Sequence, residues 1–121
     1  MTAIAHALVA LVALLHVYFL VLEMFLWTKP KGLKVFGQSL ERAQATAVLA
    51  ANQGLYNGFL AAGLLWSLCQ DTPEFARQLK IFFLACVIVA GLYGGYSVSR
   101  KIALVQALPA ALALLLVIFT S

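Results

Sequence analysis

Four long stretches of apolar residues constrain the fold of this chain more than any other feature. They cover approximately residues 3–27, 43–68, 80–98 and 102–120. A helix needs about 20 mainly apolar residues to cross a bilayer, and these stretches lack the polar–apolar alternation of membrane β-strands. The sequence therefore predicts an all-α, polytopic integral membrane protein, with residues 1–121 forming a single four-helix transmembrane bundle.

Composition excludes a soluble domain of ordinary type. The chain is 64% hydrophobic and only 10% charged, whereas soluble domains are roughly 45–50% apolar and about 25% charged. A chain of 13.1 kDa cannot bury that much apolar surface in a core of its own. Its charges lie between the apolar stretches and do not form a patch for nucleic acid. We therefore expect a lipid bilayer as partner and no nucleic acid.

Helix-ending and helix-starting residues separate the stretches. Pro30 is expected to end the first helix, because proline disfavours helical structure before it. Ser39 is a plausible N-cap for the second helix. Thr72 and Pro73 form a cap followed by proline at the first helical position, which predicts that the third helix begins near Pro73. Residues 99–101 are so few that the last two helices must form an antiparallel hairpin.

The basic residues predict the orientation in the membrane. The second loop carries Arg77 and Lys80, offset by Asp71 and Glu74. The first and third loops together carry the other six basic residues, which are Lys29, Lys31, Lys34, Arg42, Arg100 and Lys101. Because loops rich in lysine and arginine stay cytoplasmic, we expect loops 28–42 and 99–101 inside and both termini outside.

Two ionisable residues lie within the first apolar stretch. His16 and Glu23 are seven residues apart, which places them on one helix face about 10 Å apart along the axis. Ionisable groups inside a membrane are costly and usually face a bundle interior or a water-filled cavity. The alternative is that Glu23 extends to the interface and His16 only hydrogen-bonds a neighbouring helix.

The second stretch has a polar face and a small-residue face. Its polar residues fall within one sector of roughly 140° at about 100° per residue: Asn52, Gln53, Tyr56 and Asn57. The small residues on the other side form a ridge suited to close helix contact, and they are Gly54, Gly58 and Ala62. The polar face is expected either to line a site or to hydrogen-bond another helix.

The last two stretches add further polar candidates. Tyr93, Tyr96 and Arg100 lie towards the cytoplasmic end of the third helix, where the tyrosines fit either a site or an interfacial aromatic belt. Gln106 lies one turn into the fourth helix, and Pro109 is expected to kink that helix and to free a carbonyl. Gly91 and Gly95 form a second small-residue pair in the third helix.

These residues predict an intramembrane polar pocket that opens to the cytoplasm, with Glu23 and Arg100 as its charge pair and His16 at its floor. The leading hypothesis is a protein that binds or transports a small molecule or ion. Because four helices are few for a complete pathway, we expect a homo-oligomer with the glycine ridges as contact surfaces. The full set of candidate ligand-binding residues is His16, Glu23, Asn52, Gln53, Tyr56, Asn57, Tyr93, Tyr96, Arg100 and Gln106.

No established catalytic or metal-binding motif is present. His16 and Glu23 are too far apart on one helix to hold the same metal ion. Cys69 and Cys86 differ in depth, so no disulfide is expected. The residues therefore predict no metal and no cofactor, with binding of a lipid-soluble haem or quinone at His16 as an open alternative. They favour a function other than catalysis. An accessory role, in which every polar group only joins helices, is a further alternative.

Several segments resemble a family of small bacterial membrane proteins, the domain of unknown function 1304. The matching segments are residues 16–27, 34–37, 50–59 and 97–101, and the run Asn-Gln-Gly-Leu-Tyr-Asn-Gly from Asn52 is the most specific. The resemblance covers nearly the whole chain. It implies a four-helix protein of the bacterial inner membrane without an established activity.

A looser likeness is to the membrane-associated eicosanoid and glutathione (MAPEG) proteins. It is carried by Glu41-Arg42-Ala43, Asn52, Gly95-Tyr96 and Arg100. This likeness implies a trimeric thiol transferase that binds glutathione, with Arg100 stabilising a thiolate and Tyr96 orienting it. Asn52 departs from that pattern by about one helical turn.

Overall fold

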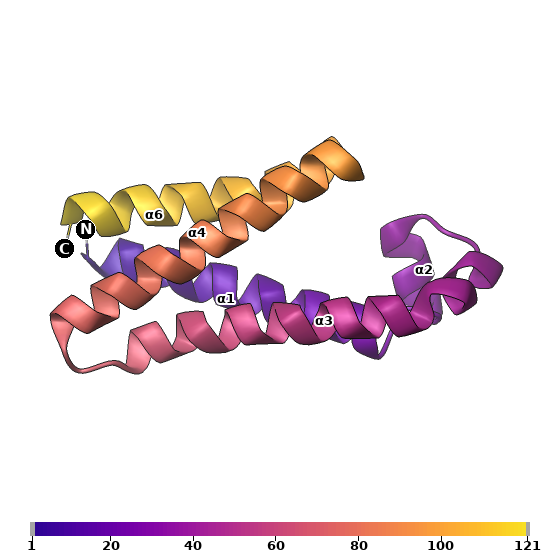
Figure 1. The fold of residues 1–121 in the computed structure, drawn as a ribbon, viewed down its shortest axis with the longest axis horizontal. Coiled ribbons are helices and arrows are strands. Elements are labelled where there is room, and N and C mark those ends of the chain that lie inside the picture. The colour runs from indigo at the N-terminus through magenta and orange to yellow at the C-terminus, as the bar shows by residue number, and fades with distance from the viewer. Residues whose placement is uncertain (1, 121) are drawn as a thin grey trace. The chain divides into compact units, whose positions relative to one another are not determined.

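The computed structural model describes residues 2–120, and the regular elements in this range are helices. In chain order they are α1 (Thr2–Met24), α2 (Pro30–Phe36), α3 (Leu40–Cys69), α4 (Pro73–Ser97), α5 (Arg100–Ile102), the π-helix η1 (Ala103–Ala107) and α6 (Leu108–Thr120) (Figure 1). No strand occurs within residues 2–120. The predicted all-α class is therefore confirmed.

Three helical runs are long and apolar enough to cross a membrane, namely α1, α4 and the run from Arg100 to Thr120. At 30 residues α3 is the longest helix. Within residues 2–120, α3 is not among the helices apolar enough to cross a membrane, because Asn52, Gln53 and Asn57 interrupt its apolar residues. The stretches predicted as the first, third and fourth spans thus have membrane-spanning character, whereas the second is helical but more polar.

Two helix boundaries differ from the predicted ones. The first helix was expected to reach Trp27 but ends at Met24, where the amides of Phe25 and Leu26 both donate to the Val21 carbonyl and end the regular ladder. α4 begins at Pro73, as the capping signal predicts, and not at residue 80, where the apolar stretch starts. Helix α2 was not predicted at all.

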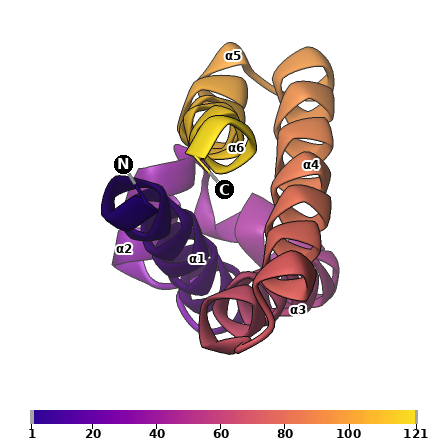
Figure 2. The same cartoon turned by 90° about the vertical axis from the view of Figure 1, so that its left-hand side faces the viewer.

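Among the described residues, one compact unit comprises residues 2–13 and 60–120. In it α4 packs against η1 and α6, and Figure 2 shows α5 at the turn of this antiparallel hairpin. The hairpin predicted across residues 99–101 is therefore confirmed. The buried core of the unit is small and aliphatic, and it comprises Ala5, Val9, Val12, Ala13, Leu64, Leu84, Val87, Ala110, Ala113 and Val117.

The second compact unit comprises residues 14–59, which are the end of α1, all of α2 and the first two-thirds of α3. Close contact between α1 and α3 in this unit depends on glycine. A Cβ added at Gly54 would lie 2.7 Å from Met24 Cγ and 3.0 Å from Glu23 Cβ, and one added at Gly58 would lie 2.7 Å from Leu20 Cδ1. Small residues at a helix contact let the backbones approach closely.

Candidate functional site

The predicted site residues that the structure joins by a direct hydrogen bond are Glu23 of α1 and Asn57 of α3. The Asn57 side-chain amide donates from Nδ2 to Oε1 of Glu23 at 2.5 Å. Asn57 is buried, with 5% of its surface exposed, and Glu23 is half-buried. Hydrogen bonds to an ionised acceptor are shorter and stronger than bonds between neutral groups. This hydrogen bond is therefore a polar link between α1 and α3.

Glycine explains why these two side chains meet. Asn57 lies three residues after Gly54 and directly before Gly58, on the side of α3 that faces α1. The absence of Cβ atoms at Gly54 and Gly58 brings the α3 backbone close to Leu20 and Glu23. The predicted small-residue ridge is thus a packing face at these two glycines, whereas Ala62 is exposed.

His16 lies in the same unit and is buried, with 1% of its surface exposed. The Phe19 ring packs edge-on against its imidazole with 5.3 Å between the ring centroids. This burial fits both interpretations of His16, a residue of a site and a residue that only bonds a neighbouring helix. Its role as a titrating group at a pocket floor stays a prediction.

The other polar residues of α3 do not join Glu23. Asn52 and Gln53 are exposed, and Tyr56 is 50% exposed with its ring against Phe59 at 6.0 Å between centroids. The four residues of the predicted polar sector therefore have two different environments. Asn57 lies at the edge of the sector, next to the glycines, and contacts α1, whereas the other three residues are exposed.

The remaining candidates lie in the other unit. Tyr93 and Tyr96 are 70% and 90% exposed, and Arg100 is also exposed. Gln106 is half-buried in η1, where its Cβ would lie 3.0 Å from a Cβ added at Gly91. Pairing of Arg100 with Glu23 stays a prediction.

The second pair of glycines is also used within the chain. A Cβ at Gly91 would lie 2.8 Å from the backbone nitrogen of Ala107, and one at Gly95 would lie 2.5 Å from the Cβ of Ala103. Together with Gly54 and Gly58, these glycines face neighbours in the same chain. These glycines therefore serve contacts within the chain, and assembly of several copies stays a prediction.

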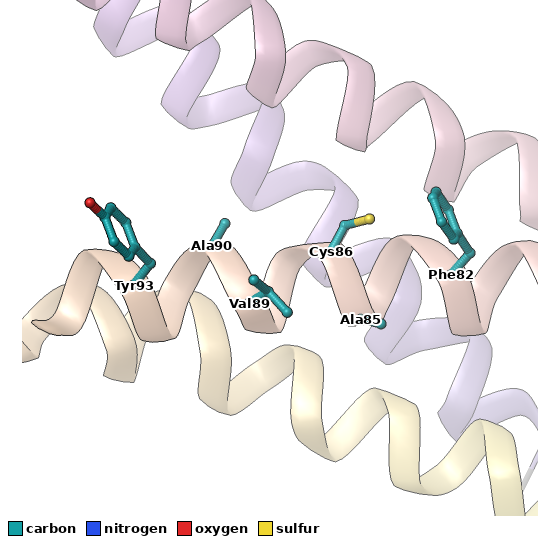
Figure 3. Close-up of a pocket in the computed structure, with 6 residues that line it drawn as sticks. All are labelled: Phe82, Ala85, Cys86, Val89, Ala90 and Tyr93. Atoms are coloured by element: carbon teal, nitrogen blue, oxygen red, sulfur yellow. The ribbon is translucent and has the colours of Figure 1, made fainter.

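A shallow, open groove of about 530 Å³ runs along α4 (Figure 3). It has no charged lining residue, and Tyr93 is the only predicted site residue in it. This groove is not the polar pocket that the sequence predicts. Its lining residues are Phe82, Ala85, Cys86, Val89, Ala90 and Tyr93.

A second interaction centre, which sequence reasoning missed, lies around Trp27. The indole Nε1–H of Trp27 donates to Thr46 Oγ1 at 3.1 Å, and the Thr46 hydroxyl donates to the Arg42 carbonyl at 2.9 Å. The Trp27 ring also lies 4.7 Å from the Phe36 ring, centroid to centroid. The available signal was a tryptophan between an apolar stretch and a group of lysines, which is typical of a membrane interface.

Metal-binding chemistry has no support in the described residues, which contain no group of three or more His, Cys, Asp and Glu side chains able to hold an ion. Cys69 and Cys86 are free thiols, the first exposed and the second half-buried.

The helices and the Glu23–Asn57 contact define a small all-helical protein with several helices of membrane-spanning character. The family model described as "Protein of unknown function (DUF1304)" matches residues 10–118. The chain belongs to this family, which confirms the resemblance seen in the sequence.

A curated relative agrees with this assignment. The chain is 34% identical over 119 residues to "Uncharacterized protein YpaA" of Lactococcus lactis subsp. lactis (strain IL1403), and the match covers 95% of this chain and 97% of the relative. No solved structure matches the chain. The looser likeness to the MAPEG proteins is not shown by these comparisons.

Proposed function

We propose that this protein spans the membrane with four helices and that its Glu23 carboxyl binds a small, positively charged solute or ion during transport. The observation that carries the proposal is the hydrogen bond from Asn57 Nδ2 to Glu23 Oε1 within a helix of membrane-spanning character. Ionisable residues inside membrane segments commonly mark ion and substrate pathways.

The geometry leaves the carboxyl with capacity for a ligand. An ionised carboxylate offers about four acceptor positions on its two oxygens, and Asn57 fills one of them. Glu23 is only half-buried, so part of its side chain is accessible. In the proposed site Asn57 orients the carboxylate, and the solute neutralises it by ion pairing or by donating a proton.

The proposed fourth span is α3, although it is more polar than the other three. Its glycines hold it directly against Leu20, Glu23 and Met24 of the apolar helix α1. Only residues 70–72 separate its end from α4. A helix tied to two neighbours of membrane-spanning character enters the bilayer with them, because its backbone hydrogen bonds are satisfied internally.

The proposed orientation follows the loop charges. Loops 28–42 and 99–101 are cytoplasmic and both termini lie outside, in the plasma membrane of a bacterium. Because four helices are few for a complete pathway, we also propose that several copies of the chain assemble. Their contact surface is one other than the glycine ridges.

Ion flux through reconstituted vesicles tests the proposal. Purified protein is placed in vesicles of bacterial polar lipid, and movement of H⁺, Na⁺, K⁺ and tetramethylammonium is followed after a gradient is imposed. We expect flux of one of these cations above that of protein-free vesicles. Cation flux through vesicles that contain the Glu23→Gln variant should be at least about tenfold lower than with the wild type, because the amide carries no charge to attract a cation.

The matched control is Glu41→Gln, which removes an exposed carboxylate from the first turn of α3. This variant should conduct as the wild type does. Transport is rejected if wild-type vesicles conduct none of the four cations, or if Glu23→Gln conducts as well as the wild type. Either result would favour the accessory role, in which the Glu23–Asn57 hydrogen bond only joins two helices.

A further inference from the structure

The segment from Phe25 to Arg42 is a fixed structure and not a loose connection between α1 and α3. A Cβ added at Gly32 of α2 would lie 1.9 Å from the Leu26 carbonyl oxygen, so α2 packs directly on the backbone that precedes it. The Trp27 ring contacts Phe36 at the end of α2 and donates a hydrogen bond to Thr46 of α3. These contacts hold α2 against the turn that follows α1, and Trp27 links that turn to α3.

The C-terminal end of α2 is equally well defined. Gly37 has a φ of +59°, a left-handed conformation that glycine adopts without steric cost. The amide of Gln38 donates to the Leu33 carbonyl at 3.1 Å, which is the bond that closes a helix in a Schellman motif. The orientation of the α2 side chains is therefore set by a helix fixed at its end and along one side.

One side of α2 is cationic. At about 100° per residue, Lys31, Lys34 and Val35 project together, while Gly32 lies on the side that is buried. Lys29 and Arg42, just outside the helix, are exposed as well. Between residues 25 and 42 the only acidic residue is Glu41. The segment thus presents four cations against one anion.

Exposed apolar side chains accompany these cations. Phe25 is 64% exposed, Val35 38% and Phe36 41%. A surface that combines aromatic rings, aliphatic side chains and lysines matches the boundary between the acyl chains and the headgroups of a bilayer. Clusters of four or more basic residues next to a membrane helix attract anionic headgroups.

We infer that α2 and its flanking residues form an interfacial anchor that binds anionic phospholipid headgroups through Lys29, Lys31, Lys34 and Arg42. The phosphate groups of the lipid pair with the cations, and Phe25 and Val35 enter the adjoining acyl region. The inference rests on the membrane placement proposed above, but it does not depend on transport or on Glu23.

Lipid binding by the purified full-length protein tests the anchor. Native mass spectrometry in detergent measures retention of dioleoylphosphatidylglycerol and of dioleoylphosphatidylcholine, added separately. The wild type should retain the anionic lipid preferentially. The variant Lys31→Gln/Lys34→Gln should bind it about fivefold more weakly for each lysine removed. Lys31→Arg/Lys34→Arg keeps both charges and should bind as the wild type does.

A matched variant separates a site on α2 from a general effect of charge. Arg100→Gln/Lys101→Gln also removes two exposed cations, at the turn between α4 and η1, and should retain anionic lipid like the wild type. The inference is overturned if this variant loses as much lipid as the α2 variant. Equal retention of the two lipids by the wild type would overturn it as well. Cation flux through vesicles is a separate readout, so loss of lipid binding and loss of transport are distinguishable.

Discussion

Asn57 and Asn52 are the same residue type on the same helix, yet their side chains occupy opposite environments. Asn57 is buried and donates to Glu23, whereas Asn52 is exposed. The Asn57→Ala variant should lower the free energy of unfolding by about 1–2 kcal/mol, because it removes an interhelical hydrogen bond and leaves a half-buried carboxyl unpaired. Unfolding in mixed detergent–dodecyl sulfate micelles measures the difference.

Asn52→Ala is the control, since it makes the same truncation at an exposed position of α3. It should change the free energy of unfolding by no more than about 0.5 kcal/mol. Equal destabilisation by the two substitutions would contradict the role given to the Glu23–Asn57 hydrogen bond.

At the scale of single residues, the sequence locates the polar positions but not their partners. Helical spacing correctly places Gly54 and Gly58 on a packing face. It groups Asn57 with Asn52 because both fall within one sector of about 140°. A sector that wide reaches from one neighbour of the helix to the next. Only the position of α1 decides that Asn57 faces Glu23 while Asn52 does not.

At the scale of elements, capping signals predict the helix starts well. Ser39 accepts a hydrogen bond from the Arg42 amide at 3.2 Å, as an N-cap residue does. α4 begins at Pro73 as expected, although the Thr72 side chain makes no capping hydrogen bond. The sequence does not reveal α2, because Pro30 fits the end of a preceding helix as well as the first position of a new one.

The prediction for Pro109 is refined by the structure. The π-helix η1 ends two residues before Pro109, and the Leu108 amide that follows it donates to the Ala103 carbonyl five residues earlier. Proline has no amide hydrogen and its ring crowds the carbonyl four residues before it, so the regular ladder cannot continue through this point. The disturbance that the sequence predicts is therefore accommodated as one turn of π-helix.

The contact between α4 and the π-helix yields a prediction about two neighbouring glycines. Gly91→Ala would place its Cβ 2.8 Å from the Ala107 backbone nitrogen, whereas at Gly94 the nearest atom is Cγ2 of the Ile102 side chain, at 2.7 Å. Backbone cannot move aside as a side chain can. Gly91→Ala should therefore lower the free energy of unfolding by about 1–3 kcal/mol. Unfolding in mixed detergent–dodecyl sulfate micelles measures this difference as well.

Gly94→Ala should be neutral or stabilising by up to about 1 kcal/mol, because alanine favours the helix and Ile102 can change its rotamer. The two variants thus form a pair with opposite expected signs. If Gly94→Ala is the more damaging substitution, the close contact between Gly91 and Ala107 does not control the packing of this hairpin.

For the molecule as a whole, composition predicts lipid as the solvent, and the helices agree with that prediction. The number of spans is harder to infer from composition, because the polar residues that make α3 interesting also lower its hydropathy. Hydropathy alone supports three spans, whereas the tight contact of Gly54 and Gly58 with α1 argues that α3 accompanies α1 through the bilayer. The two arrangements differ in topology and can be separated directly.

Cys69, exposed at the end of α3, is the decisive position. If α3 crosses the membrane, Cys69 lies on the same side as the start of α1. If α3 does not cross, Cys69 lies on the side of α2.

Labelling with a membrane-impermeant maleimide separates the two arrangements. In intact bacterial cells that produce a Cys86→Ala variant, the maleimide should label Cys69. In a Cys69→Ser/Cys86→Ala background it should label Thr2→Cys. The exposed Ser99→Cys should react only after permeabilisation, because the positive-inside rule places that loop in the cytoplasm. Labelling of Thr2→Cys and Ser99→Cys from outside, with Cys69 protected, would instead establish three spans with the termini on opposite sides.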